Sequence, residues 1–490
     1  MVTPTDEADR DVLDTSAAGG LVLRGGVLRG GAYFATVALS VLSAALLTRH
    51  LGAARFGSYT TVMSLVAVIA AVSDAGMSSI GTREYAVLRG EERDELMRDL
   101  LGLRVALTLA GVFAILLFAL AAGYDTPLTV GAIAAGLATV AVVFQHTLSI
   151  PLTTDLRLGL LSALELGRQA LWVGGIVVLV ALGAGVLPLL SILLLVNLIL
   201  IAPTARLVRG RISPRLSLRP QAWRPLLEAT VVFSLATAVG TIYVYTAQIL
   251  TSLVTTPHQS GVFAVSFRVF VVAASVPGLL VAAALPLLAR AARDDHDRLA
   301  YALRRIFEVS LVAGVGAALV MSAGAPFIVS VIAGPKYRGA APVLEIQAFA
   351  MIGSFVVAGW SFGLVSLRLH PGLLAANAAA LIVSVGLTLV LARSGGAKGA
   401  AIATIGAEAT LAAGTLVALT WGRRRYRPPL GVVVKVVVAG ACAGVASMVP
   451  SMPSLVRALV AAAVYAALIL ALRALPGELG ELIPRRRAPR

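Results

Sequence analysis

Residues 186–207 read VLPLLSILLLVNLILIAPTARL, a run that contains no acidic residue and a single arginine near its end. A helix needs about 20 such apolar residues to cross ~30 Å of hydrocarbon. Similar runs recur along the whole chain. The predicted segments are 27–49, 56–81, 100–122, 127–149, 160–182, 186–207, 226–252, 259–288, 306–325, 342–367, 371–392, 398–421, 431–449 and 455–475. The sequence therefore predicts an all-α integral membrane protein with fourteen transmembrane helices.

Positive residues gather in every second gap between these segments. With the N-terminus in the cytoplasm, most of the 40 Lys and Arg residues fall in inside gaps, with clusters at 83–98, 206–224, 290–305, 423–427 and 485–490. Few fall outside, namely Arg49, Arg55, Lys336, Arg338, Arg393, Lys398 and Arg457. Because cytoplasmic loops collect Lys and Arg, we expect a multi-pass protein of the cell membrane with both termini in the cytoplasm.

The composition excludes several classes of protein. A hydrophobic content of 59% exceeds the roughly 45–50% usual for soluble domains. The net charge of +16 follows from the topology and from contact with anionic membrane lipids, so nucleic acid is not expected as a partner. The single cysteine, Cys442, and the scattered histidines give no metal-site spacing. The glycines at 395–399 lack the spacing of a nucleotide-binding loop. No cofactor is expected.

The fourteen segments divide as six, six and two. The second segment of each six can be aligned without gaps by setting Gly57 on Gly261, which places Tyr59 on Phe263 and Ser64 on Arg268. Internal repeats of this kind build many transporters. Since six is even, the two halves would be related by an axis along the membrane normal, and they could rock about a central cavity.

This division predicts the organisation of the chain. We expect an N-terminal cytoplasmic tail at 1–26, an N-lobe at 27–207, a cytoplasmic inter-lobe loop at 208–225, a C-lobe at 226–421, two further helices within 431–475, and a basic cytoplasmic tail at 476–490.

Residues 47–86 read LTRHLGAARFGSYTTVMSLVAVIAAVSDAGMSSIGTREYA. This stretch resembles the opening of the polysaccharide and oligosaccharide flippases in the multidrug/oligosaccharidyl-lipid/polysaccharide (MOP) exporter superfamily. The shared elements are Leu51-Gly52, Phe56-Gly57-Ser58-Tyr59, Asp74-Ala75-Gly76 and Arg83-Glu84, and residues 334–350 and 395–408 also look familial. The resemblance implies two six-helix lobes, alternating access, and transport of an isoprenoid-diphosphate-linked saccharide to the outer leaflet. Tyr59 itself would suit an anchor at the membrane interface.

Arg268 is the first candidate for a binding residue. It lies nine residues into segment 259–288, which at ~1.5 Å per residue places it roughly 13 Å deep. A charge at that depth costs at least about 2.5–3.5 kcal/mol unless it has a partner, water or a ligand. A guanidinium group suits the oxygens of a diphosphate. Pairing with a carboxylate on another helix is the alternative.

Three other arginines could add to a basic cavity. Arg168 lies within a helix, and Glu165 three residues earlier offers an i,i+3 ion pair instead. Arg29 and Arg104 lie near helix ends, where extension of the side chain to the lipid headgroups is the competing interpretation.

Three acidic residues are candidates for gating or coupling, namely Asp74, Glu408 and Glu165. Asp74 is expected near the cytoplasmic side at the depth of Arg29, where a pair between them would be either a gate at the inner mouth or a static contact. Glu408 is expected near the midplane. A carboxyl there should be either protonated or paired, which makes it a candidate for proton coupling or for an ion partner.

The leading hypothesis is a flippase for lipid-linked saccharides, working beside glycan polymerases or glycosyltransferases. An ion-coupled multidrug antiporter of the same superfamily is the alternative, and it would favour a cavity dominated by carboxylates. An intramembrane glycosyltransferase or polymerase would need paired carboxylates on a large outside loop. Residues 326–341, the longest such loop, contain no Asp or Glu. A scaffold without transport would leave the arginine at mid-membrane depth without a purpose.

Overall fold

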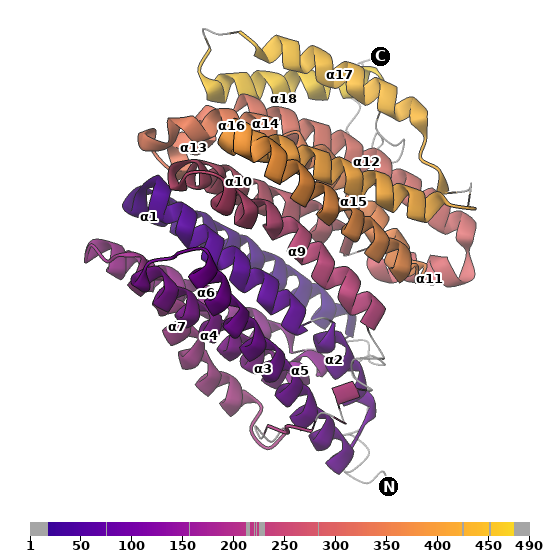
Figure 1. The fold of residues 1–490 in the computed structure, drawn as a ribbon. Helices are drawn as coiled ribbons and strands as arrows, with labels where there is room; N and C mark the ends of the chain where they lie inside the picture. The colour runs from indigo at the N-terminus through magenta and orange to yellow at the C-terminus, as the bar shows by residue number, and fades with distance from the viewer. Residues whose placement is uncertain are drawn as a thin grey trace.

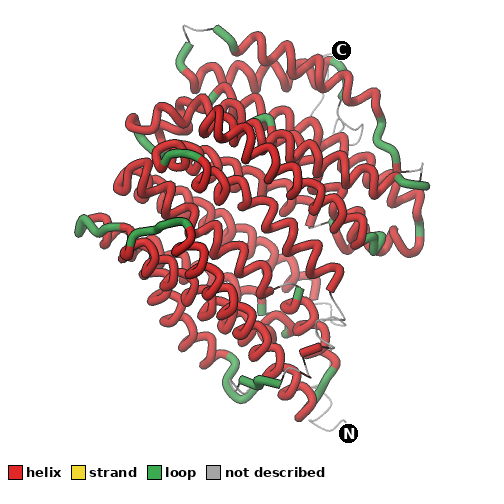
Figure 2. Tube along the Cα trace, in the orientation of Figure 1, coloured by secondary structure: helices red, strands yellow, loops and turns green. Residues whose placement is uncertain are grey.

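The computed structural model describes residues 18–74, 76–155, 157–211, 216–219, 221, 223–224, 231–282, 284–423, 426–449 and 452–474. Within these ranges the chain is helical and contains no strand (Figure 2). The elements are α1 (Ala18–Asp74), α2 (Met77–Val87), α3 (Gly90–Ala121), α4 (Thr126–Leu148), α5 (Ile150–Thr154), α6 (Leu158–Ala181), α7 (Val186–Leu207), α9 (Val231–Val254), α10 (Pro257–Ala282), α11 (Leu285–Asp294), α12 (His296–Ala323), α13 (Ala325–Ile332), η2 (Pro335–Ala340), α14 (Ala341–Gln347), α15 (Ala350–Ser366), α16 (His370–Thr420), α17 (Leu430–Ser447) and α18 (Ser454–Ala471).

Eleven helices of the described chain are long and apolar enough to cross a membrane, or up to twelve when one bent pair is counted as a single span. That pair joins Pro335–Gln347 to Ala350–Ser366 at 49°. Large apolar side chains on the outside of the bundle stay exposed, for example Leu182 at 75% and Phe113 at 61%. An aqueous surface would not present so many apolar groups, whereas hydrocarbon accepts them. The protein is a multi-pass membrane protein.

Two of the long helices contain a sharp break at a glycine. In α1 the break is Gly52, with φ 72°, and in α16 it is Gly396, with φ 55°. A positive φ is readily adopted only by glycine, so the chain can reverse there without a longer loop. Both breaks coincide with gaps between predicted segments. We refer to the end of the bundle that carries Gly52 and Gly396 as the predicted outer end, and to the opposite end, which carries Asp74, as the predicted inner end.

Several predicted segments differ from the helices in their bounds; for example, α3 begins at Gly90 and α12 at His296, each well before its segment. Segment 56–81 stops early, because α1 ends at Asp74 and Gly76 adopts φ 77° before α2 begins. Segment 259–288 divides into α10 and the amphipathic α11. Helix α1 begins at Ala18, inside the stretch expected to be a tail, whereas residues 1–17 and 475–490 of the two predicted tails lie outside the described residues.

The helices pack in two groups that follow one another in the sequence (Figure 1). In the first group α1 packs on α3, α4 and α6, and α4 packs on α7. In the second, α16 packs on α9 and α15, and α15 also packs on α12. Helices α17 and α18 pack together and cover α12 at the edge of the second group. We call these groups the first and second halves.

The two halves meet where α1 contacts α9 and α10. At the centre of this contact, a Cβ added to Gly57 of α1 would lie 2.7 Å from the backbone nitrogen of Gly261 in α10. A Cβ added to Gly261 would overlap the carbonyl oxygen of Ala53. The two backbones therefore touch because neither glycine has a side chain. We call this contact the glycine seam.

Polar contacts close the halves together around the glycine seam. The Gln248 side-chain nitrogen on α9 lies 3.3 Å from Thr61 Oγ1 on α1 and 3.4 Å from Ser260 Oγ on α10. The Tyr337 hydroxyl donates to the Thr48 carbonyl oxygen at 3.0 Å, and Arg49 Nη2 donates to the Val331 carbonyl oxygen at 2.6 Å. All of these contacts lie at or near the predicted outer end, which is closed.

Candidate functional site

Arg268 lies on α10, one of the helices of the second half that pack on α1. Its side chain is half-buried, and it forms no ion pair with any residue in the described part of the chain. Its charge acts on the hydroxyls of Tyr59 on α1 and Tyr245 on α9. Three helices therefore converge here, and the carboxylate partner that sequence alone allowed for Arg268 is absent among the described residues.

The Tyr59 side chain is buried in the apolar core of the bundle. Only 5% of the residue is exposed, and its ring stacks with that of Phe56 at 6.4 Å between centroids. Its hydroxyl has no hydrogen-bond partner among the described residues. The expectation that Tyr59 anchors at the membrane interface is therefore wrong, because the ring packs in the core of the bundle.

A second group of charges lies in the first half, toward the predicted inner end. Arg104 on α3 donates to Asp74 Oδ1 at 2.7 Å, and Ser78 donates to the same oxygen. The Arg104 side chain is 1% exposed and that of Asp74 is 42% exposed. Asp74 was expected to pair with Arg29, whose side chain lies outside the described residues. Arg104 does not extend to the headgroups, because the α1 carboxylate holds it inside the bundle.

Arg168 and Glu165 on α6 form the i,i+3 ion pair that the sequence offered. His146 on α4 lies near both ion pairs. The charges of all four residues act on its imidazole ring. The structure thus brings together four of the predicted residues from α1, α3 and α6. Sequence reasoning missed His146, since a lone histidine in an apolar helix carries no local signal.

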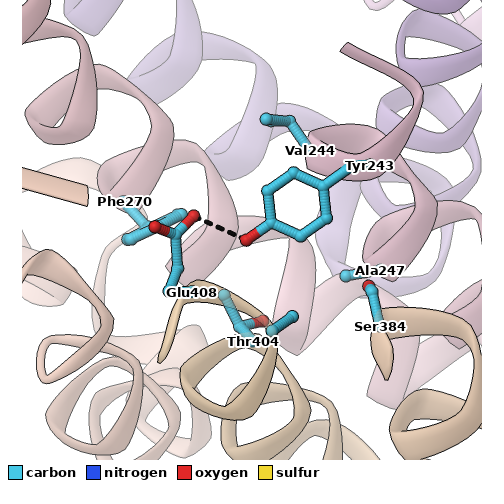
Figure 3. A pocket seen from close by; sticks show the side chains of 8 residues that line it. Tyr243, Val244, Ala247, Phe270, Ser384, Thr404 and Glu408 are labelled. Carbon is cyan, nitrogen blue, oxygen red and sulfur yellow. Dashed lines mark hydrogen bonds between the residues drawn. The ribbon is translucent and has the colours of Figure 1, made fainter. Parts of the chain in front are cut away.

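Glu408 on the second part of α16 lies within the second half, apart from the other candidates. The Tyr243 hydroxyl donates to Glu408 Oε1 at 2.7 Å, and Ser354 Oγ donates to Oε2 at 2.9 Å (Figure 3). Gly353 permits this approach, because a Cβ there would lie 2.9 Å from the Cβ of Glu408. Both donors were absent from the sequence-based candidates, since they lie on other helices.

A small cavity, with room for about one water molecule, borders the Glu408 carboxyl. Its polar lining comes from Tyr243, Ser384, Thr404 and Glu408, and Phe270 closes one side (Figure 3). The carboxyl is thus bonded by hydroxyl groups rather than by a cation within the described residues. Nowhere among the described residues are three or more His, Cys, Asp or Glu side chains grouped so that they could hold a metal ion.

Comparisons with known proteins show the family and the fold of this chain. A family model described as a polysaccharide biosynthesis protein matches residues 46–342. No curated protein matches the sequence. Among solved structures, the lipid II flippase MurJ in an inward closed conformation superposes with a TM-score of 0.75 at 12% identity, covering 91% of this chain and 99% of MurJ.

Two transporters of the MOP superfamily are also similar in fold. A multidrug resistance MATE family transporter in an inward-facing conformation superposes with a TM-score of 0.62 at 15% identity, covering 80% of this chain and 94% of that one. A transporter from Pyrococcus furiosus gives 0.52 at 14% identity, covering 82% and 93%. At such identities the likeness shows the fold alone.

The family model covers more than half of the chain, and the matched residues include the Leu51-to-Tyr59 motif, the glycine seam and Arg268. The resemblance drawn from residues 47–86 is therefore confirmed, and the fold is the one that MurJ and the MATE transporters share. This chain belongs to the polysaccharide biosynthesis protein family.

Proposed function

We propose that this protein is a flippase that moves an isoprenoid-diphosphate-linked oligosaccharide or polysaccharide precursor from the inner to the outer leaflet by alternating access. The observation that carries the proposal is Arg268, an arginine on a helix that joins the two halves and without an ion pair among the described residues. The family model for polysaccharide biosynthesis and the fold shared with MurJ, a lipid II flippase, support it. The protein is then a transporter and not an enzyme.

The chemistry of Arg268 favours a phosphorylated headgroup. Holding a charge at membrane depth without a counter-ion costs at least about 2.5–3.5 kcal/mol. A ligand with anionic oxygens removes this cost by forming two parallel N–H···O bonds. The charge cluster of the first half, with Arg104 and Arg168, provides further positive groups. Each is already paired with a carboxylate, so we assign it a supporting role.

The architecture that we propose has fourteen spans. The breaks at Gly52 and Gly396 divide two helices of about twice the usual length, and the bent pair at 335–366 adds another span. Residues 27–207 and 226–421 form two six-helix lobes related by a parallel repeat around a central cavity. The glycine seam supports the alignment of Gly57 with Gly261. Two residues that are related by a two-fold axis and also touch must both lie beside that axis.

The contacts of the glycine seam close the predicted outer end, so the cargo cannot leave to the outer side in this conformation. The headgroup would enter from the predicted inner end and leave after the seam parts. The protein lies in the plasma membrane, and both of its termini lie in the cytoplasm. Anionic lipids contact the basic inner surface, and glycosyltransferases or a polymerase supply and consume the cargo.

Glu408 is our candidate for the coupling residue. It is a buried carboxyl held by two neutral donors, so it could take up or release a proton without breaking an ion pair. The Asp74–Arg104 contact joins α1 to α3 and is our candidate for an inner gate, with Glu165 as a further gating candidate. Arg29 stays a candidate for the basic cavity from the sequence alone.

A multidrug antiporter is the second candidate, and Glu408 is the observation that favours it, because a buried carboxyl can exchange a proton for a cation. The MATE folds agree with that possibility as well as they agree with a flippase. The unpaired charge at the contact between the halves is positive, however, and it would repel a cationic drug.

The test uses purified protein in proteoliposomes with a fluorescent, diphosphate-linked lipid saccharide. Arg268→Ala should lower the rate of transfer between leaflets by about tenfold or more, as expected for losing a hydrogen bond to a charged group. Arg268→Lys should retain part of the rate. Arg338→Ala is the matched control, since Arg338 is exposed at the predicted outer end. Wild-type transfer by Arg268→Ala at equal incorporation would remove Arg268 from the site.

A further inference from the structure

We infer that Arg49 and Tyr337 form a latch that holds the predicted outer end closed, because each of them caps a helix end that belongs to the other half. Arg49 lies on α1 in the first half, and Tyr337 lies on η2 in the second. This inference rests on the alternating access of the proposed function. It adds two positioning residues that set the balance between the closed and open states of the outer end.

The end of α13 lacks backbone partners for its last two carbonyl groups. Helix α13 ends at Ile332, and the next two backbone N–H groups bond the carbonyl oxygens of Val329 and Ser330. Gly334 then turns the chain away with φ 82°. Within the described part of the chain, no backbone N–H bonds the carbonyl oxygen of Val331 or Ile332. The last carbonyls of a helix need partners from outside it.

The first half supplies these partners, because α13 packs on α1 (Figure 1). Arg49 Nη2 donates to the Val331 carbonyl oxygen at 2.6 Å. Thr48 Oγ1 lies 3.1 Å from the Ile332 carbonyl oxygen, but it shares its one proton with the Ala44 carbonyl oxygen at 2.7 Å. A cation at the C-terminal end of a helix also favours the helix dipole. Arg49 is therefore the principal cap of α13.

Tyr337 caps in the opposite direction, from the second half to the first. Its hydroxyl donates to the Thr48 carbonyl oxygen at 3.0 Å, and the residue is only 2% exposed. Thr48 lies in the last turn of α1 before the break at Gly52. Each half therefore caps a helix end of the other half, and neither cap survives if the halves separate at this end.

The latch explains a positive charge in a place where the topology disfavours one. Arg49 is one of the few cations at the predicted outer end, and outer loops usually contain few Lys and Arg residues. Two helix ends with partial negative charge meet there, the end of α13 and the turn before Gly52. A guanidinium group that reaches from one to the other offsets their repulsion only while the halves are together. Loss of the latch should therefore shift the population toward the open outer end.

Tyr465 provides a matched control for Tyr337. Its hydroxyl also donates to a backbone carbonyl oxygen, that of Val312 at 2.9 Å, and the residue is 6% exposed. Tyr465 and Val312 both belong to the second half, on α18 and α12. Removing either tyrosine hydroxyl costs one largely buried hydrogen bond, but only the bond of Tyr337 connects the halves. Arg338, which is exposed at the same end, is the control for Arg49.

The experiment measures how fast a cysteine beside the glycine seam is labelled by a water-soluble maleimide in the full chain, reconstituted in lipid nanodiscs. The reporter is Thr61→Cys in a Cys442→Ser background. Thr61 is fully buried and lies 3.3 Å from the Gln248 side-chain nitrogen of the second half. While the open state is the minor one, the labelling rate is proportional to its population.

Tyr337→Phe should raise the labelling rate by about fivefold, the factor that one hydrogen bond contributes. Arg49→Ala should raise it by about fivefold to tenfold. Arg49→Lys should raise it less, because a cation remains at the end of α13. The double variant of Arg49→Ala and Tyr337→Phe should be labelled faster than either single variant. Tyr465→Phe and Arg338→Ala should be labelled at the parent rate, although Tyr465→Phe should melt at a lower temperature, as Tyr337→Phe should.

Equal labelling of Tyr337→Phe and Tyr465→Phe would overturn the latch, because the rate would then follow stability alone. Labelling of Arg49→Ala at the parent rate would overturn it as well. Neither measurement needs a cargo, so both of these outcomes leave the proposed function standing. The expected rates in a protein that moves no lipid saccharide would instead support the latch and overturn the proposed cargo.

Discussion

Gly57 and Gly261 touch backbone to backbone at the point where the two halves of the chain meet. The alignment of the second segment of each half sets these same two residues on one another. A contact between equivalent positions is expected only beside a symmetry axis. The two residues that the sequence alignment makes equivalent therefore also touch where α1 packs on α10. This contact is the one that we propose opens during transport.

The first prediction concerns this pair. Gly261→Ala should force the seam apart, because the added Cβ would overlap the Ala53 carbonyl oxygen. We expect faster labelling of a Thr61→Cys reporter by a membrane-impermeant maleimide from the outer side, together with slower transport. Gly386→Ala is the control, since a Cβ there meets nothing within 4 Å. Unchanged labelling in Gly261→Ala would show that the seam does not close the outer side.

The second prediction concerns the ion pair of Asp74 and Arg104. Asp74→Ala leaves Arg104, at 1% exposure, buried without its counter-ion, which should lower the free energy of unfolding by about 3–5 kcal/mol. Arg104→Met leaves a carboxylate that is 42% exposed, so its cost should be smaller.

Denaturant unfolding in detergent measures both variants of this pair and the double variant. The double variant should be more stable than Asp74→Ala, because no buried charge remains. A larger loss in Arg104→Met than in Asp74→Ala would contradict this ordering.

The third prediction separates the structural role of Glu408 from its coupling role. Glu408→Gln keeps an acceptor for Tyr243 or Ser354 and should fold with little loss of stability. Glu408→Leu leaves the Tyr243 hydroxyl without that acceptor and should cost about 1–3 kcal/mol, whereas Ser354 keeps the Ala350 carbonyl oxygen at 3.3 Å. If Glu408 carries the coupling proton, transport by Glu408→Gln should no longer respond to an imposed pH gradient. Tyr243→Phe should still respond, and a normal response in Glu408→Gln would exclude the coupling role.

The fourth prediction compares the two helix breaks. Gly52→Ala adds a Cβ that meets nothing, so only the positive φ opposes it, at a cost of about 1–3 kcal/mol. Gly396→Ala should cost more, because its Cβ would also lie 2.8 Å from Gln259 Oε1, which accepts from the Ala397 N–H. Melting temperatures in detergent rank the two variants. Equal melting temperatures would show that the Gln259 contact adds nothing.

The elements that the sequence predicted well are those that depend on local hydropathy. The gaps at 50–55 and 393–397 coincide with the breaks at Gly52 and Gly396, because a chain that must reverse in a few residues uses glycine there. The end of α1 at Asp74 was not predicted, since the apolar run continues past Gly76 and hydropathy does not register a positive φ.

The contacts of the candidate site were predicted unevenly for a physical reason. The pair of Arg168 and Glu165 is local, and i,i+3 spacing makes it visible in the sequence. The partner of Asp74 lies on α3 and the donors to Glu408 lie on α9 and α15, so each depends on how helices pack. Depth along a helix identified Arg268, but the lack of an ion pair for it among the described residues could be learned only from how the helices pack.

The most direct test of the proposed function is which class of molecule the purified wild-type protein moves across the membrane of a proteoliposome. We predict transfer of a diphosphate-linked lipid saccharide between leaflets, inhibition of that transfer by free isoprenoid diphosphate, and no uptake of an organic cation such as ethidium. Cation uptake driven by an ion gradient, with the lipid saccharide left in its original leaflet, would contradict the account.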